Sequence, residues 1–242
     1  YGECSKYLEE ALEEYTGSDD AGVRTELTHY LGISLVETGE HQKGRPYLER
    51  AFQTHEERGD IERACLVLGY LGICLFEMGE LEEAERHLRD ALTIQKDMEG
   101  KDQISRTLVT LGETLIKLEK HEEARQHLEE ALTYQAGERE RGRTLESLGS
   151  VLVHLGEREE ALKRFEEARE IFKSLGDLEA TARNLHGLGL LQEEPYEIES
   201  SIIHLKEAFE IYSELGASES TIAVLNDMGL RMSQKGDYGE VK

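Results

Sequence analysis

Glutamate, histidine, cysteine and arginine are the side chains of this sequence that could do chemistry, and their spacing decides which chemistry is available. The chain has no HExxH zinc motif, no P-loop and no GxSxG nucleophile motif. His121 and His127 lie six residues apart, and no cluster of Cys or His has metal-ligand spacing. Carboxylate pairs cannot be distinguished from a solvated surface at this glutamate content. We therefore expect no catalytic residue, no metal and no cofactor, so the chain is not predicted to be an enzyme.

The charge of the chain is strongly negative. Its formal net charge is -24 over 242 residues, which would repel nucleic acid and anionic membranes. Two interpretations stay open, namely solvated glutamate-rich helix faces and a preference for cationic partners. His87 and His127 share one position of the repeat described below, and we expect both on the outer surface.

The number of cysteines and the hydropathy of the sequence indicate the cellular compartment in which the chain acts. The three cysteines Cys4, Cys65 and Cys74 are odd in number and show no CxxC spacing, which favours a reducing compartment and hence the cytoplasm. We interpret Cys4 and Cys74 as buried small residues rather than reactive thiols. No apolar run approaches the roughly 18 residues that a membrane span needs, and no signal peptide is recognisable.

A Leu-Gly or Met-Gly pair recurs along the chain at an almost constant step. The steps between pairs are 40, 40, 37, 40 and 40 residues, and the pairs are Leu31-Gly32, Leu71-Gly72, Leu111-Gly112, Leu148-Gly149, Leu188-Gly189 and Met228-Gly229. A period in this range indicates a stacked repeat architecture. In such arrays, function usually lies on an extended surface built by several repeats.

Each repeat is predicted to form two helices. In the third repeat the apolar spacing of a helix face occurs at Leu108, Leu111, Gly112 and Leu115, and again at Ala124, Leu128 and Ala131. A glycine inside a helix costs about 1 kcal/mol relative to alanine, so its recurrence requires a packing reason. We expect the missing side chain of Gly112 to admit the second helix, with the small Ala124 serving the same contact.

Glycines also mark the predicted ends of helices. We expect left-handed helix stops at Gly39, Gly79, Gly156 and Gly236, and ends of second helices at Gly59, Gly100, Gly176 and Gly216. Pro195 replaces the turn glycine of the fifth repeat, and Leu118-Glu119-Lys120 joins the helices of the third. Aspartates that follow these glycines can cap the next helix.

These residues resemble the tetratricopeptide repeat (TPR), whose pattern is Leu-Gly at positions 7 and 8, Ala at 20, a large apolar residue at 24 and Ala at 27. The second, third and fourth repeats match throughout, as in Leu71, Gly72, Ala84, Leu88 and Ala91, whereas the first and fifth carry Gly44 and Ser201 at position 20. The long period is similar to that of Pins/LGN, kinesin light chain and MalT-like sensor regions. The resemblance implies an all-α fold, an α-solenoid in which antiparallel helix pairs form a right-handed superhelix of about 13 helices.

The repeat divides the chain. We predict a single solenoid over 1-242, made of a half repeat at 1-20, five repeats at 21-60, 61-100, 101-137, 138-177 and 178-217, and a partial repeat at 218-242. The short step shortens the link at Gly137, where we expect a local change in twist. The chain begins and ends inside repeats, and its first residue is not Met, so we expect either a fragment or ends that self-associate.

The TPR resemblance places the first helix of each repeat on a concave face. The first two repeats would then present six apolar or aromatic residues there, namely Tyr30, Ile33, Val36, Tyr70, Ile73 and Phe76. Such a patch usually marks a binding surface, although tight superhelical packing could also hide these side chains.

The later repeats place arginines on the same face. Arg106, Arg143 and Arg183 share position 2 and could hold carboxylates, unless glutamates of the array such as Glu146 pair with them. His186 and Asn226 could add hydrogen bonds. The Lys and Asn pattern that chaperone-binding TPR proteins use to clamp two carboxylates is missing at position 9, which argues against a chaperone C-terminus as ligand.

The sequence thus predicts a non-catalytic module that binds a peptide or protein segment in a concave groove. An alternative is the ligand-sensing, autoinhibitory region of a larger signalling ATPase or transcription regulator. We expect neither nucleic acid nor a membrane as a partner.

Overall fold

The computed structural model describes residues 2–15, 21–98, 101–134, 137–191 and 197–240. Within these ranges the regular structure is entirely helical. The helices are α1 (Gly2–Glu14), α2 (Ala21–Glu37), α3 (His41–Glu57), α4 (Ile61–Glu77), α5 (Leu81–Asp97), α6 (Lys101–Lys117), α7 (His121–Thr133), α8 (Glu138–His154), α9 (Arg158–Leu175), α10 (Leu178–Leu191), α11 (Ile198–Leu215) and α12 (Ser218–Glu240).

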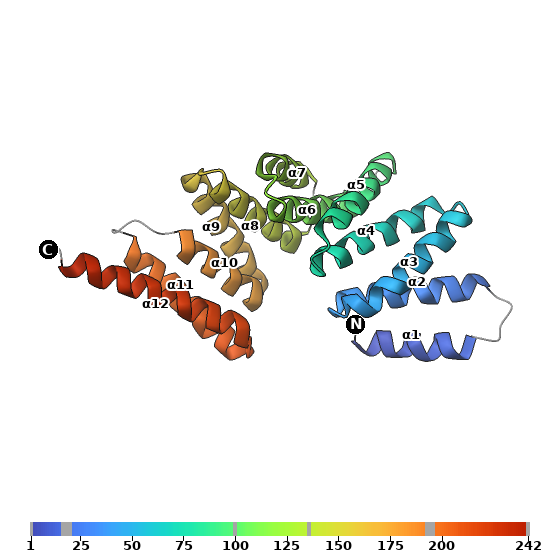
Figure 1. Cartoon of the computed structure of the whole chain (residues 1–242), viewed down its shortest axis with the longest axis horizontal. Helices are drawn as coiled ribbons and strands as arrows, with labels where there is room; N and C mark the ends of the chain where they lie inside the picture. The colour runs from blue at the N-terminus through green and yellow to red at the C-terminus, as the bar shows by residue number, and fades with distance from the viewer. Residues whose placement is uncertain (1, 16–20, 99–100, 135–136, 192–196, 241–242) are drawn as a thin grey trace. The chain divides into compact units, whose positions relative to one another are not determined.

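The chain forms two compact units, residues 1–135 and 136–242. Unit 1 contains α1 to α7 and unit 2 contains α8 to α12 (Figure 1). The boundary falls beside Gly137, where the repeat takes its one short step of 37 residues. A solenoid is stabilised by contacts between neighbouring repeats, so a shortened link is a natural place for one compact unit to end.

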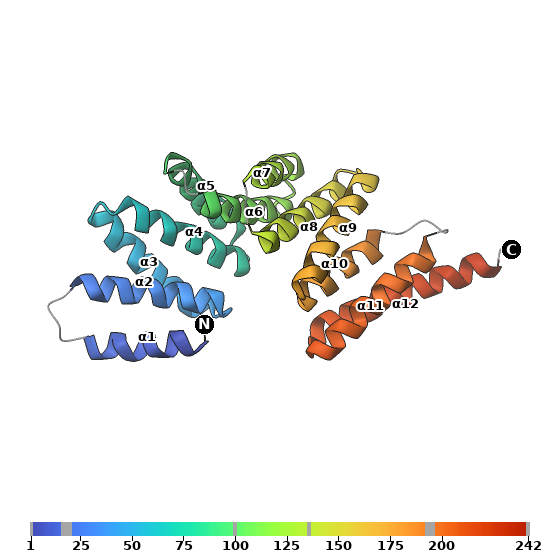
Figure 2. The same ribbon diagram turned by 180° about the vertical axis from the view of Figure 1, so that it is seen from behind.

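Inside each unit every helix packs against the next along the chain, as both views show (Figures 1 and 2). The first helices of successive repeats also contact one another, α2 with α4 and α4 with α6 in unit 1, and α8 with α10 in unit 2. The second helices α3, α5, α7, α9 and α11 each pack on the first helix of their own repeat. The first helices of a unit therefore share one surface.

The repeated glycine allows this packing. A Cβ atom at Gly72 would lie 2.6 Å from Leu88 Cγ, which is closer than side chains can approach. The same close approach, between 2.6 and 3.0 Å, occurs at Gly32 on Leu48, Gly112 on Leu128, Gly149 on Phe165 and Gly189 on Leu205. The predicted packing reason is confirmed, but the group that fills the space is the large apolar residue at position 24.

The small residue at position 20 contacts the glycine from the other side. In the fifth repeat Ser201 Oγ donates a hydrogen bond to the Gly189 carbonyl at 2.6 Å. In the first repeat a Cβ at Gly44 would lie 3.1 Å from the Gly32 carbonyl oxygen. The two departures from the Ala pattern therefore conserve the close contact between the helices.

Most predicted helix ends are confirmed. The described glycines Gly39, Gly59, Gly79, Gly156, Gly176 and Gly216 all have positive φ, between 66° and 80°, and Glu119 takes the same conformation with φ 60°. Asp60 caps α4 by accepting from the Arg63 amide at 3.2 Å, and Asp177 accepts from the Ala180 amide at 3.2 Å. Gly100 and Pro195 lie outside the described residues.

The predicted stop at Gly236 is wrong. Helix α12 continues through Gly236 to Glu240, so the described chain has 12 helices instead of about 13. Helix α12 packs on α11, but a Cβ at Gly229 would meet nothing within 4 Å. The close contact that Gly72 makes with Leu88 has no counterpart at Gly229, and α12 continues as one helix to Glu240.

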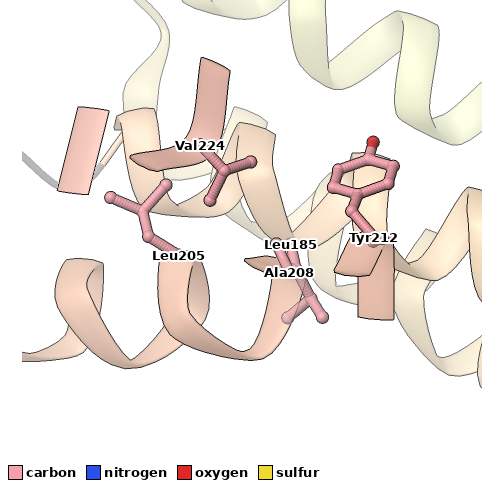
Figure 3. Close-up of a cluster of buried hydrophobic side chains, with 6 residues drawn as sticks. Leu185, Leu205, Ala208, Tyr212 and Val224 are labelled. Carbon is pink, nitrogen blue, oxygen red and sulfur yellow. The ribbon is translucent and has the colours of Figure 1, made fainter. Parts of the chain in front are cut away.

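The interior consists of leucine and alanine with a few aromatic rings. Figure 3 shows one such cluster in unit 2, where Leu185 of α10, Leu205 and Tyr212 of α11 and Val224 of α12 meet. In unit 1 the thiols of Cys65 and Cys74 are buried, as predicted for Cys74, and burial raises the pKa of each to about 11.

Cys4, by contrast, is exposed, which corrects the prediction that it is buried. Position 20 of a repeat packs against the glycine of that repeat's own first helix, as Gly44 does against Gly32, whereas α1 packs on α2 of the following repeat.

Candidate functional site

The apolar residues predicted on the first helices of unit 1 differ in exposure. Tyr30 is 51% exposed, and its ring stacks on His29 at 5.0 Å. Ile33, Tyr70 and Ile73 are half-buried.

Two of the six predicted residues are buried, Val36 at 5% and Phe76 at 7% exposure. Val36 faces Gly44 on α3, since a Cβ there would lie 3.2 Å from Val36 Cγ2. Phe76 is covered by Lys117, whose Nζ lies 4.2 Å from the ring centre. The accessible part of the patch is therefore smaller than the sequence pattern suggests.

Arg106 connects the three first helices of unit 1. Its Nη2 donates to Glu37 Oε1 on α2 at 2.7 Å, and its Nη1 donates to the Tyr70 hydroxyl on α4 at 2.9 Å. The guanidinium carbon also lies 4.8 Å from the centre of the Tyr70 ring. Burial raises the pKa of Tyr70, so this hydroxyl stays protonated. Arg106 thus follows the alternative that the sequence left open, pairing inside the array.

A cavity of about 190 Å³ opens beside this bridge. Its walls come from α4, α5 and α6, namely Leu66, Gly69, Tyr70, Ile73, Gln95, Gln103, Arg106 and Thr107. Three of the predicted residues, Tyr70, Ile73 and Arg106, therefore line one space. Gln95 is 3% exposed, and its Oε1 has no hydrogen-bond partner within the described ranges.

Sequence reasoning did not find Gly69 or Gln95. A signal existed for both, because each occupies a fixed position of the repeat. Position 5 holds a larger side chain in every other repeat, at His29, Val109, Glu146, His186 and Asn226. The side chain four residues after the alanine at position 27 is buried in four repeats, namely at His55, Gln95, Phe172 and Tyr212.

In unit 2 the predicted polar residues are also engaged with each other. Arg183 donates from Nε and Nη2 to both carboxylate oxygens of Glu146, at 3.0 to 3.2 Å. Arg143 is half-buried and close enough to disfavour the charge of Arg183. His186 Nε2 lies 2.7 Å from Asp227 Oδ2, and Asn226 is exposed.

A second cavity, of about 650 Å³, lies between α8, α9 and α10 of unit 2. Two apolar side chains on its wall, Val153 and Leu190, are each 41% exposed. Ser150 and Leu190 stand at position 9 of their repeats, the position that Ile73 has in unit 1. Both units therefore have a cavity on the surface that their first helices share.

The histidines expected on the outer surface are in fact half-buried. His87 and His127 lie on α5 and α7, and burial lowers the pKa of each imidazole. Among the described residues no group of three or more His, Cys, Asp or Glu could hold a metal ion. No described helix combines the length and hydropathy that a membrane span requires.

The architecture defines an all-α helical-repeat protein built of antiparallel helix pairs. The tetratricopeptide repeat model matches residues 23–97, 62–136 and 140–214. The chain belongs to the tetratricopeptide repeat family. No curated protein matches it by sequence.

Solved structures share the fold at low identity. The Rap conjugation gene regulator of plasmid pLS20, in complex with the Phr* peptide, is 21% identical, with TM-score 0.66, over 98% of this chain and 70% of the regulator. The apo quorum sensor NprR from B. thuringiensis is 13% identical, with TM-score 0.75, over 91% and 62% of the two chains. Kinesin light chain TPR-like repeats from Podosopora anserina are 16% identical, with TM-score 0.62, over 80% and 97%.

Proposed function

We propose that the chain is a non-catalytic interaction module that binds a peptide or protein segment on its first helices. The observation that carries the proposal is the cavity of unit 1, which three residues of the predicted concave face, Tyr70, Ile73 and Arg106, line together. The cavity of unit 2, with Val153 and Leu190 on its wall, supports the same function. A solved structure of the same fold contains a bound peptide.

The arginines have a different part in the proposal than the sequence suggested. Arg106 and Arg183 already bind Glu37 and Glu146, so they hold first helices together and shape the surface. In unit 1, contacts to the ligand come from Tyr30, Ile33, Tyr70 and Ile73. In unit 2, Asn226 is an exposed hydrogen-bonding group. The net charge of -24 favours neutral or cationic peptides over nucleic acid or anionic membranes.

A displayed library of random dodecapeptides, selected on the immobilised chain, tests this function. We expect selected peptides whose affinity falls at least tenfold in Ile73→Asp, because a carboxylate would then face the apolar wall of the cavity. Phe76 is unsuitable for this test, since it is buried and its replacement would damage the fold.

The matched control is Ile61→Asp, the same chemical change on the same helix. Ile61 is 62% exposed at the first turn of α4 and does not line the cavity. Equal losses in both variants, or no loss in Ile73→Asp, would contradict the proposed surface.

A regulatory function is the second candidate, favoured by two solved structures of the same fold, which are a conjugation gene regulator and a quorum sensor. Self-association is a further part of the proposal, supported by exposed Ile222, Leu230 and Met232 on α12. Light scattering with small-angle X-ray scattering, with and without a selected peptide, tests both. A sensor should change its radius of gyration when the peptide binds, and a self-associating chain should have twice the mass of the monomer. A monomeric mass would contradict self-association, and an unchanged radius of gyration would contradict the sensor.

The three cysteines of the chain are free, which supports a reducing compartment such as the cytoplasm as the site of action. This localisation is part of the proposal and is tested by fractionating cells that express the tagged chain. Recovery outside the cytoplasm would contradict it.

A further inference from the structure

Gly69 distinguishes the second repeat from the others on the surface of the first helices. The other repeats have a side chain at this position, as at His29 and Val109. A Cβ at Gly69 would meet only Gln95 Nε2 at 3.6 Å and Thr107 Oγ1 at 3.8 Å, which are ordinary contact distances. Packing therefore does not require a glycine at this position, as it does at Gly72. The missing side chain leaves Gln95 and Thr107 accessible from the cavity.

The first repeat shows what fills this space elsewhere. There His29 and His55 occupy the positions equivalent to Gly69 and Gln95, and their ring nitrogens approach to 3.3 Å. In the second repeat the side chain from the first helix is missing. Gln95 Nε2 is the carboxamide atom nearest to the open position, 3.6 Å from a Cβ placed on Gly69, and the buried Oε1 of the same carboxamide has no partner among the described residues. A buried acceptor without a partner is destabilising, and so is a glycine inside a helix. Two local disadvantages at one cavity are typical of a functional site.

We propose that this cavity is the specificity pocket of the peptide-binding surface and that it takes the primary amide side chain of Asn or Gln. A primary amide carries both a donor and an acceptor, so it can pair with the carboxamide of Gln95 whichever end of that carboxamide faces the cavity. The volume of about 190 Å³ lies below the range of whole-ligand pockets and suits one side chain. This inference rests on the proposed peptide binding.

The walls disfavour three other classes of side chain, namely aliphatic side chains, carboxylates and lysine. Leu66 and Ile73 offer apolar contact to a methylene stem but no hydrogen bond, so an aliphatic side chain would leave Gln95 unsatisfied. A carboxylate would bring a second acceptor against Oε1. A lysine would bring its positive charge next to Arg106, whose guanidinium already holds Glu37.

Selection from the dodecapeptide library tests the pocket directly. We expect Asn or Gln to be enriched at one position of the selected peptides, and replacement of that residue by Ala to weaken binding to the wild-type chain tenfold or more. In Gly69→Leu the new side chain fills the cavity, so the same replacement should then change affinity less than twofold.

Gln95→Leu provides a second variant that does not depend on filling the cavity. It removes the carboxamide and keeps the volume, so selection should change from Asn or Gln to Leu or Met. Circular dichroism melting of both variants reports whether they fold, and Gly69→Ala, which meets no steric obstacle, narrows the pocket if Gly69→Leu does not fold.

A direct probe needs no selected peptide. In NMR spectra, N-acetylglutamine methylamide should shift the side-chain amide signals of Gln95 at millimolar concentration, and N-acetylleucine methylamide and N-acetylglutamate methylamide should shift them much less. Equal shifts from the three compounds would overturn the amide preference.

Failure of the pocket inference can be distinguished from failure of the proposed peptide binding. If peptides bind in an Ile73-dependent way but show no amide preference, the pocket inference is wrong and the proposed function stands. If no selected peptide depends on Ile73, the proposed function fails and the pocket inference falls with it.

Discussion

Gly72→Ala is expected to lower the free energy of unfolding by about 1 kcal/mol, although alanine is the better helix former. Its Cβ would lie 2.6 Å from Leu88 Cγ and 2.7 Å from Leu88 Cδ2. Leu88 is fully buried, so it cannot rotate away into solvent. Over-packing of this kind costs about 1–3 kcal/mol, which outweighs the helix propensity gain of about 1 kcal/mol.

Two other helical glycines serve as controls of opposite sign. Gly69→Ala, three residues earlier on α4, meets no atom closer than 3.6 Å, and Gly229→Ala meets nothing within 4 Å. Each should raise stability by about 1 kcal/mol through helix propensity alone. Gly229 belongs to the same Met-Gly or Leu-Gly pattern as Gly72, so the pair separates the packing effect from the motif itself.

Urea unfolding followed by circular dichroism measures all three changes. Stabilisation of the chain by Gly72→Ala would show that Leu88 can yield and that the repeated glycine is dispensable for packing. Destabilisation by Gly229→Ala would show that this position makes contacts that the helix alone does not explain.

The sequence predicts the packing of the helices well because the same contact is made in every repeat. Gly72 and Leu88 are separated by only 16 residues, and the pattern returns at Gly112 and Leu128. A local constraint that is repeated along the chain leaves few alternative arrangements. The wrong helix stop at Gly236 lies in α12, where Gly229 makes none of the close contacts that Gly72 and Gly112 make.

The site is less predictable because it depends on contacts between repeats. Arg106 pairs with Glu37, 69 residues away, and Arg183 pairs with Glu146, 37 residues away. Sequence position places each arginine on the correct helix, but it does not tell which carboxylate the guanidinium reaches. The sign of the local charge on the surface follows from these pairings.

Exposure is the second property that the periodicity misses. Val36 and Phe76 share the register of Ile33 and Ile73, but they are buried. Val36 packs against Gly44 on α3, and Lys117 on α6 lies over the ring of Phe76. The cavity beside Gly69 arises in the opposite way, from a side chain that is missing. A missing side chain such as that of Gly69 is found by comparing the repeats position by position. The hydrophobic periodicity does not reveal it, because a glycine hardly changes the apolar pattern.

Acidification is expected to destabilise unit 1 through the buried pair of His29 and His55. These side chains are 1% and 2% exposed, and their ring nitrogens lie 3.3 Å apart. Burial, with added repulsion from His55 and Arg63 and only partial relief from Asp60, lowers the pKa of His29 from 6.5 to about 4. Burial also lowers the pKa of His55, against the opposing effect of Asp60 and Glu26.

The sign follows from the difference between the folded and unfolded states. Below pH 6.5 the unfolded chain gains protons on these imidazoles that the folded chain does not accept, so stability falls as the pH falls. For His29 the loss grows from about pH 6.5 to about pH 4 and reaches roughly 3 kcal/mol. His55 adds to it in the same direction.

Urea unfolding at a series of pH values between 7 and 4 measures this loss. In His29→Gln the stability should depend much less on pH in that window, because the titration of His29 and its repulsion with His55 are removed. His154→Gln, which replaces an exposed histidine on α8 of unit 2, is the control for a histidine replacement outside the buried pair. If His29→Gln and the wild-type chain lose stability equally on acidification, the protons bind elsewhere, and the half-buried His87, His127 and His204, whose pKa values burial also lowers, become the groups to replace next.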